Sequence, residues 1–211
     1  MLSILLAYAR FKKLIYLSYI LLLACSQGPY LKTEAVSEIN TNPKWNHHQN
    51  LVKALTQYQV HGTLLLYSNN QKLFARFYWK QISPHHYQFL LSNLLGMTEL
   101  QLEQKDQFVY IHTRDRKCVV SEKYAEYIIF QLTGIMVSLK NFSQWIMGLP
   151  GASTDFRLDS ESHLRELSFG ISSTQLHIFY LGYRKAPDKP AMPSHIELYQ
   201  GKQRIKLKID Q

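Results

Sequence analysis

Residues 72–80 read KLFARFYWK, and the alternation in this stretch decides the fold class. Successive side chains of a β-strand point to opposite faces, so every second residue shares a face. One face carries Leu73, Ala75, Phe77 and Trp79, and the other carries Phe74, Arg76, Tyr78 and Lys80. The first face is entirely apolar, while the second is mixed. The stretch is therefore predicted to be a half-buried strand with a core on one side.

Similar short segments recur on both sides of this strand, separated by turn residues. The predicted strands are 60–67, 87–91, 97–103, 108–112, 118–120, 156–158, 164–169, 176–183, 196–199 and 204–209. Residues 69–71, which read NNQ, are predicted to form the turn before residue 72. The many strands joined by short connections predict a sheet of antiparallel hairpins.

Three segments have helical features instead. Residues 44–58 place one set of side chains at three- or four-residue spacing, which predicts a packed helix face. That set is Trp45, His48, Val52, Leu55 and Gln59. A second helix is predicted between Ser121, a good N-cap, and Gly134, a good C-cap. Its apolar stripe is Tyr124, Tyr127, Ile128 and Leu132.

The third helix is predicted over residues 139–147, where Ser138 can cap the start and Gly148 with Pro150 ends it. Its apolar face is Leu139, Phe142, Trp145 and Ile146. Short helices within a run of hairpins predict a mainly β protein with some α: a curved antiparallel sheet with helices packed over one face. Such a sheet encloses apolar side chains, and either a filled core or an apolar cavity fits the pattern.

The N-terminus predicts export. Residues 1–24 contain Arg10, Lys12 and Lys13 but no acid, followed by the apolar run LIYLSYILLL. This order is typical of a secretory signal, and the run is shorter than the about 20 residues that span a bilayer. A buried helix or a short membrane anchor is the alternative. The ending LLAC, residues 22–25, resembles the bacterial lipobox, which implies that Cys25 receives an S-diacylglycerol and an N-acyl chain.

The resemblance to the lipobox also sets the expected organisation. Residues 1–24 are then a removed signal, 25–43 a lipidated N-terminus with a flexible tether, and 44–211 a single domain. Ser26 follows the lipidated cysteine where an Asp commonly retains such proteins in the inner membrane. The absence of Asp implies export to the outer membrane.

The chain is basic, with a formal net charge of +9 and no long run of one sign. This charge allows binding to anionic membranes or acidic partners and does not demand nucleic acid.

Residues that could carry chemistry are few. The chain lacks the phosphate-binding, dinucleotide-binding, zinc-protease and serine-hydrolase motifs. His85 and His86 lack a ligand partner at metal spacing, and Asp155 and Asp159 are interpreted as solvated turn residues. Cys118, in KCVVS, is predicted to be a buried, inert thiol. We therefore expect no enzyme, no metal and no cofactor.

Several longer stretches carry a family resemblance. They are WNHHQ at 45–49, QYQ at 57–59, Gly62, ARFYW at 75–79, LLSNLLGMTEL at 90–100, QWIMGLPG at 144–151 and QRIKLK at 203–208. In these the mature chain closely resembles the LolB family of outer-membrane lipoprotein receptors of Gram-negative bacteria. The resemblance implies an incomplete antiparallel β-barrel with a helical lid over an apolar cavity. The soluble carrier LolA has the same fold, so the fold does not distinguish receptor from carrier. The lipobox does distinguish them, because the receptor is anchored and the carrier is soluble.

The resemblance also implies a function and partners. A monomer anchored in the inner leaflet of the outer membrane, with its domain facing the periplasm, would accept lipoproteins from LolA. It would bind their acyl chains in the cavity and insert them among outer-membrane phospholipids. The competing hypotheses are a lipid-anchored assembly or structural factor that transfers no acyl chain, and an anchored hydrolase, which the missing acid and base constellation disfavours.

The resemblance also implies roles for individual residues. Phe77, Trp79, Leu100 and Trp145 are expected to be cavity wall or core residues. In the family an exposed leucine on the SNLLG hairpin loop serves delivery into the membrane, and Leu95 matches it. Leu94 stands where the family usually has proline, a change expected to leave the loop more mobile. The alternative is that both leucines fold back into the core.

Overall fold

The described part of the chain is residues 42–68, 71–170 and 175–210 of a computed structural model. All of it belongs to one compact unit, residues 34–211. The predicted signal, Cys25, most of the tether and residues 69–70 of the predicted turn lie outside the described residues.

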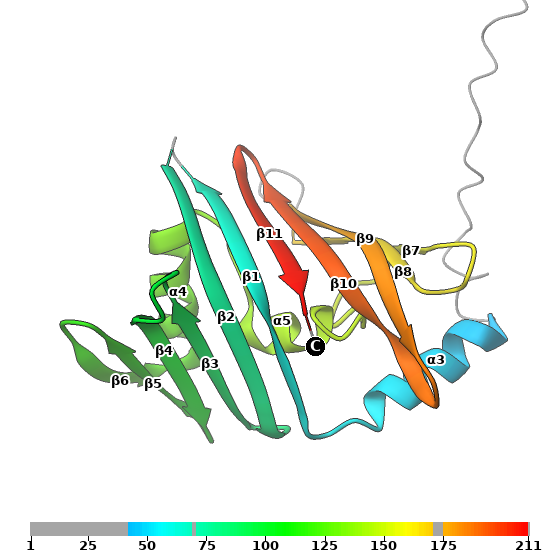
Figure 1. The fold of residues 1–211 in the computed structure, drawn as a ribbon, viewed down its shortest axis with the longest axis horizontal. Coiled ribbons are helices and arrows are strands. Elements are labelled where there is room, and N and C mark those ends of the chain that lie inside the picture. Colours follow the sequence, from blue (N-terminus) through cyan, green and yellow to red (C-terminus); the bar gives the residue numbers. More distant parts are fainter. Residues whose placement is uncertain (1–41, 69–70, 171–174, 211) are drawn as a thin grey trace, which may run out of the picture. The chain divides into compact units, whose positions relative to one another are not determined.

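The described residues form one eleven-stranded sheet (Figure 1). Its strands are β1 Tyr58–Ser68, β2 Gln71–Ser83, β3 His86–Ser92, β4 Thr98–Lys105, β5 Phe108–Thr113, β6 Lys117–Ser121, β7 Asp155–Leu158, β8 Leu164–Phe169, β9 Leu176–Ala186, β10 Lys189–Gln200 and β11 Gln203–Ile209. The order is β6-β5-β4-β3-β2-β1-β11-β10-β9-β8-β7, and every neighbouring pair is antiparallel. The first and last strands therefore pair in the middle, and β6 and β7 form the two edges.

Three helices complete the described part: α3 Pro43–Lys53, α4 Glu122–Thr133 and α5 Leu139–Trp145. The chain passes from edge strand β6 through α4 and α5 to edge strand β7, and both helices lie on the same face of the sheet (Figure 1). Helices span the gap that a closed barrel would fill with strand pairing. The predicted fold class, a curved antiparallel sheet with helices over one face, is confirmed.

The helix ends follow the sequence rules. The Ser121 side chain accepts a hydrogen bond from the Tyr124 backbone N–H, and Gly134 adopts a left-handed conformation with φ of 70°. Ser138 caps α5 in the same way through Asn141. The predicted apolar face of α5 is buried as expected: Leu139, Phe142, Trp145 and Ile146.

The predicted apolar stripe of α4 is only partly packed. Tyr124, Tyr127 and Leu132 are more than half exposed, and Ala125 is the fully buried residue of the helix. Apolar character alone predicts that stripe, but α4 packs on the core through Ala125, Ile128 and Ile129. The buried face of α4 is therefore rotated from the one predicted.

Helix α3 is shorter than the predicted 44–58. It ends at Lys53, and β1 already begins at Tyr58. Trp45, His48 and Val52 are buried as predicted, whereas Leu55 lies beyond the helix and is 39% exposed. The helical spacing in the sequence continues past the end of α3 at Lys53, because Leu55 lies three residues after Val52.

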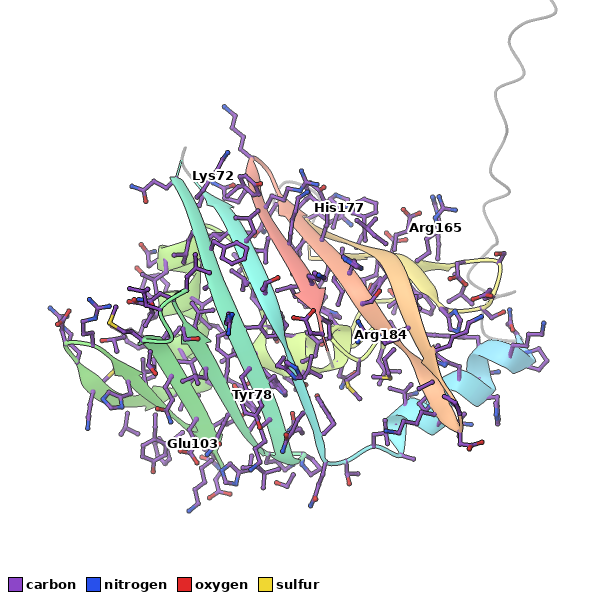
Figure 2. The ribbon with its side chains drawn as sticks, in the orientation of Figure 1. Lys72, Tyr78, Glu103, Arg165, His177 and Arg184 are labelled. Atoms are coloured by element: carbon purple, nitrogen blue, oxygen red, sulfur yellow. The ribbon has the colours of Figure 1, made fainter. Side chains whose placement is uncertain are left out.

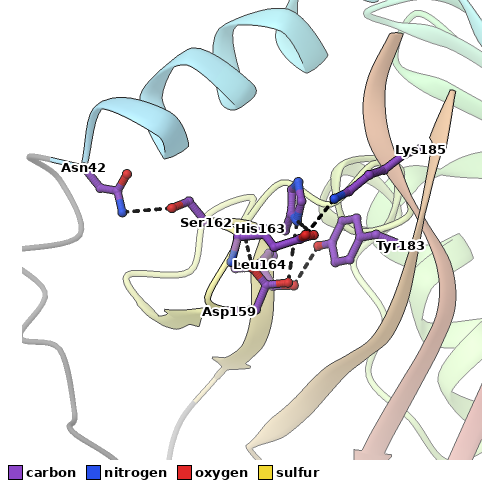
Figure 3. Close-up of polar contacts among 8 residues, drawn as sticks. Asn42, Asp159, Ser162, His163, Leu164, Tyr183 and Lys185 are labelled. Carbon is purple, nitrogen blue, oxygen red and sulfur yellow. Dashed lines mark hydrogen bonds and ion pairs between the residues drawn. The ribbon is translucent and has the colours of Figure 1, made fainter. Parts of the chain in front are cut away.

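Close contacts fix α3 against the turn between β7 and β8 (Figure 3). Asn42 Nδ2 donates to Ser162 Oγ at 3.2 Å. The His48 ring meets the His163 ring edge-on with centroids 5.0 Å apart, and His163 in turn stacks on Tyr183 at 4.7 Å. Among the described residues the apolar core extends from Trp45 to Ile209, so this unit carries a core of its own and is expected to fold without the predicted signal.

Cys118 corrects one prediction, because its side chain is exposed and not buried. Its neighbours Val119 and Val120 suggested a core strand, but β6 is an edge strand with a largely exposed burial pattern. An edge strand has a neighbour on one side only, so apolar residues there need not reach the core.

Candidate functional site

An apolar pocket of about 120 Å³ lies between the sheet and the helical segment. Strands β1 to β4 and β11 supply one wall, and α4, α5 and the connection between them supply the other. The lining residues are Leu64, Leu66, Leu73, Trp79, Phe89, Leu91, Leu100, Leu102, Ile129, Leu132, Thr133, Val137, Leu139, Phe142 and Ile205. The only hydroxyl in this lining, that of Thr133, donates to the Ile129 carbonyl at 2.8 Å. The lining thus presents hydrocarbon to any occupant.

Aromatic rings form the deep wall of the pocket. Trp79 is fully buried, stacks on Tyr87 with centroids 4.4 Å apart, and contacts Phe142 at 5.6 Å. Its indole N–H donates to Gln81 Oε1 at 3.1 Å, so no unpaired donor of Trp79 faces the pocket. Burial raises the pKa of Tyr58 to about 12 and also raises the pKa of Tyr87, so both phenols stay uncharged.

The pocket opens between the start of β2 and the end of α4. Leu73 and Leu132 line it, yet their side chains are 44% and 63% exposed, so both reach solvent at the pocket mouth. The Met136 backbone N–H donates to Gln200 Oε1 at 2.6 Å, which ties the segment after α4 to the β10–β11 turn. The mouth therefore lies at the end of the sheet where β2 begins and β10 ends.

The β3–β4 loop, residues 93–97, stands beside this mouth. Leu91 and Leu100 pair at its base and both line the pocket. At its tip Leu94 is 63% exposed and Leu95 is 84% exposed. The alternative that both leucines fold back into the core is therefore wrong. An apolar path runs from the pocket lining to two exposed leucines.

Hydrogen bonds define the loop shape. Asn93 Oδ1 accepts from the backbone N–H groups of Leu95 and Met97, each at 3.0 Å, and Asn93 Nδ2 donates to Glu99 Oε1 at 2.8 Å. Gly96 supplies the left-handed backbone position, with φ of 81°. The tip is thus a structured turn that holds Leu94 and Leu95 outward.

The four expected cavity or core residues divide into two groups. Trp79 and Leu100 line the pocket, whereas Phe77 and Trp145 are buried in the core outside its lining. Sequence reasoning missed Val137 and Ile129, on the helical wall, and Leu64 and Leu66 in β1. Period-two alternation in β1 carried a signal for the last two, while no local pattern marks Val137, which lies between helices.

The other candidates have structural roles. His86 Nε2 lies 3.0 Å from Glu103 Oε1, and Asp159 Oδ1 accepts from the backbone N–H groups of Glu161 and His163. Among residues 42–68, 71–170 and 175–210, no cluster of three or more His, Cys, Asp or Glu side chains is arranged to hold a metal ion. No helix in the described ranges has both the length and the hydropathy to cross a membrane.

The comparisons with a family profile and with known relatives agree on one family. The profile described as "Outer membrane lipoprotein LolB" matches residues 56–211. The outer-membrane lipoprotein LolB of Erwinia tasmaniensis is 42% identical over 201 residues, which cover 95% of each chain. That of Serratia proteamaculans is 39% identical over 198 residues, covering 94% of this chain and 93% of its own. Among solved structures, a LolA superfamily protein from Nitrosomonas europaea has a similar fold. It gives a TM-score of 0.52 at 9% identity, over 78% of this chain and 91% of that one.

Proposed function

The chain belongs to the LolB family of outer-membrane lipoproteins, and from that premise we propose that it is a lipoprotein receptor. It accepts the acyl chains of a client lipoprotein from the carrier LolA into the apolar pocket and passes them to the outer membrane. The observation that carries this proposal is the hydrocarbon-lined pocket that opens beside the exposed Leu94 and Leu95. Transfer of this kind makes and breaks no covalent bond, so we propose no enzymatic step.

The energy of exposing an acyl chain explains the need for the pocket. Burying each CH₂ is worth about 0.8 kcal/mol, so a chain of sixteen carbons resists transfer through water by roughly 12 kcal/mol. A hand-over between two apolar cavities avoids that barrier. The direction then follows from rising affinity, from the carrier to the receptor to the bilayer.

The size of the pocket implies that the helices move. Its volume of about 120 Å³ compares with engineered cavities of about 150 Å³ that hold one benzene molecule. A whole acyl chain needs more room than that. Helix α4 has one fully buried residue, Ala125, so less packing holds it to the sheet than holds α5. We propose that α4 shifts away from the sheet to admit the chain.

Anchoring at Cys25 completes the proposal. Two or more acyl chains on Cys25 would hold the protein in the inner leaflet of the outer membrane, with the domain in the periplasm, since one chain alone binds only marginally. Mass spectrometry of the mature N-terminus tests this step. We expect a chain that begins at a triacylated Cys25, and an unmodified cysteine or an intact signal would contradict it.

Leu95→Glu separates the two stages of transfer. Burying one leucine in lipid is worth about 1.5–3 kcal/mol, and a glutamate reverses that gain. We expect the variant to accept lipoprotein from a loaded LolA as the wild type does, and to insert it into vesicles at least about tenfold more slowly. Leu181→Glu, at a leucine on β9 that is 63% exposed, is the control and should change neither stage.

The alternative function is a lipid-anchored assembly factor that binds proteins without moving acyl chains. Mixing the soluble domain with a LolA–lipoprotein complex decides between the two. If the lipoprotein stays with the carrier under conditions in which both proteins are folded, the receptor proposal is wrong.

A further inference from the structure

The register of the sheet brings five separate segments to the end where the pocket opens. Arg76 of β2 pairs with Ser92, so the first residues of β2 and the β3–β4 loop share this end. Leu100 pairs with Thr113, which adds the β5–β6 turn, and Tyr67 pairs with both Lys72 and Arg204, which adds the β10–β11 turn. The end of α4 joins through the Met136–Gln200 hydrogen bond. We call residues 71–74, 92–99, 113–117, 130–137 and 200–203 the mouth rim.

The mouth rim exposes more apolar surface than the leucine loop alone. Its exposed large apolar side chains are Leu73, Phe74, Leu94, Leu95, Met97, Leu132 and Met136. They come from three chain segments that lie on different sides of the pocket mouth: the start of β2, the β3–β4 loop and the end of α4. A set this large around one opening indicates an interaction surface.

Charge is also distributed unevenly between the two ends of the sheet. The exposed basic residues of the mouth rim are Lys72, Arg114, Arg116, Lys117 and Lys202. Its acids are Glu99, which pairs with Arg114 at 2.8 Å, and Asp115. The opposite end mixes both signs: its acids are Asp106, Glu122, Asp159, Glu161, Asp188 and Asp210, and its bases are Lys105, Lys123, Arg184, Lys185 and Lys189. The excess of basic residues is therefore confined to the mouth rim. Figure 2 shows Lys72 and His177 at the end of the sheet that bears the rim, and Glu103 far from it.

From this arrangement we propose that the whole mouth rim docks flat on an anionic phospholipid bilayer, with Phe74 and the basic residues forming a second contact beside the leucine loop. This inference rests on the receptor function proposed above and adds the lipid charge and the contact residues. Lysines near an anionic surface contribute about a fivefold gain in binding each. The exposed phenyl ring of Phe74 would add apolar contact by burial among the acyl chains.

A bilayer fits the rim better than a protein partner does. The apolar side chains are spread around an opening, and basic side chains flank them, which matches acyl chains beneath a layer of phosphate groups. Docking in this orientation places the pocket mouth, between Leu73 and Leu132, directly against the membrane. An acyl chain could then leave the pocket without crossing water.

Vesicle binding by the unlipidated domain, residues 26–211, tests the electrostatic part. We expect Lys72→Glu with Lys202→Glu to weaken binding to phosphatidylethanolamine–phosphatidylglycerol vesicles by at least about tenfold at low salt. Binding to pure phosphatidylcholine vesicles should change little. The matched control is Lys105→Glu with Lys189→Glu, exposed lysines at the opposite end, which should bind both vesicles like the wild type. Equal losses in the two double variants, or none in the first, would overturn the proposal.

Phe74→Ser tests the apolar part. Phe74 is 44% exposed on the outer face of β2, and it belongs neither to the pocket lining nor to the leucine loop. We expect it to weaken binding to both kinds of vesicle by several-fold, because burial of a ring in lipid does not depend on headgroup charge. Leu181→Ser is the control and should have no effect. Unchanged vesicle binding by Phe74→Ser would limit the contact to the leucine loop and refute this proposal.

A transfer assay without vesicles keeps the two proposals apart. If the wild type takes no lipoprotein from LolA, the receptor function itself fails. If transfer from LolA is normal but the Lys72→Glu, Lys202→Glu variant binds vesicles as the wild type does, only the docking proposal fails. If the lysine variants lose transfer from LolA and keep vesicle binding, the rim is the carrier's docking site and not the membrane's.

Discussion

At the scale of single residues, Asn93 shows how one side chain shapes the proposed membrane loop. The sequence predicted a more mobile loop, because Leu94 replaces the stiffening proline of the family. Asn93 holds the tip by another route, because it accepts hydrogen bonds from the Leu95 and Met97 N–H groups and donates one to Glu99. Such a network could not be read from the sequence, since it depends on the exact path of the turn.

We predict that Asn93→Ala loosens the tip without unfolding the domain. A hydrogen bond is worth about 0.5–1.5 kcal/mol, and these three lie at or near the surface, so at the low end of that range the unfolding free energy should fall by about 1.5 kcal/mol. Hydrogen exchange of the Leu95 and Met97 amides should accelerate, and insertion into vesicles should slow. Unchanged exchange at both amides would show that the backbone alone sets the loop.

A buried histidine, His48, gives α3 a pH response. Burial, together with the nearby His163, lowers the pKa of His48 to about 4, and Asp159 opposes this shift. The folded pKa lies below the ordinary value of 6.5, so between these values the unfolded chain binds the proton first. Stability is therefore complete above about pH 6.5 and declines as the pH falls toward 4.

The prediction is that melting temperature falls between pH 6.5 and pH 4 more steeply in the wild type than in His48→Gln. His112, which is exposed on β5, supplies the control. His112→Gln should keep the wild-type slope. Identical slopes in all three proteins would place the pH response elsewhere.

At the scale of elements, the α4–α5 segment explains which predictions succeeded. Helix α5 was predicted with its buried face correct because that face packs into the core through Phe142 and Trp145. Helix α4 was predicted with correct ends, since Ser121 and Gly134 are local signals. Its packed face was predicted only in part: Ile128 packs on the core and Leu132 lines the pocket, but Tyr124 and Tyr127 remain at the surface. Local chemistry sets helix ends, whereas tertiary contacts set which face is buried.

Gly134 is predicted to matter beyond its backbone conformation. An added Cβ would lie 2.9 Å from the Gln203 side chain, and φ of 70° also disfavours other residues. Gly134→Ala should therefore lower the unfolding free energy by about 1–2 kcal/mol. Gly96→Ala is the control with similar strain, since φ is 81° and a Cβ there meets nothing within 4 Å. A larger loss at Gly96 than at Gly134 in chemical denaturation would contradict the proposed contact.

At the scale of the whole molecule, the pocket depends on elements far apart in sequence. The alternation of β2 and the recurrence of short strands predicted the curved sheet and its helical cover. The central pairing of β1 with β11 and the pocket wall supplied by Val137 were not predictable from local patterns. Both arise from long-range packing, which leaves no periodic trace in a single sequence.

Filling the pocket should stop acyl-chain acceptance. In Leu100→Trp the larger side chain occupies part of a space of about 120 Å³ at the base of the leucine loop. We expect transfer from LolA to drop strongly, with a stability cost of about 1–3 kcal/mol from overpacking. Vesicle binding should persist. Leu181→Trp makes the same change on the surface and should transfer normally, and normal transfer by Leu100→Trp would place the acyl chain elsewhere.

The seam between β1 and β11 has a consequence for biogenesis. Gly62 pairs with Ile209, so the two halves of the sheet join only when nearly the whole chain is present. Contacts between residues so far apart in sequence slow folding. The entropy cost of closing the long loop comes before the strand pairing that stabilises it. The β1–β6 half and the β7–β11 half can form their hairpins first, but each lacks its central neighbour. A nascent chain therefore stays open until the last strand is available, which would suit the proposed export of the protein before it folds.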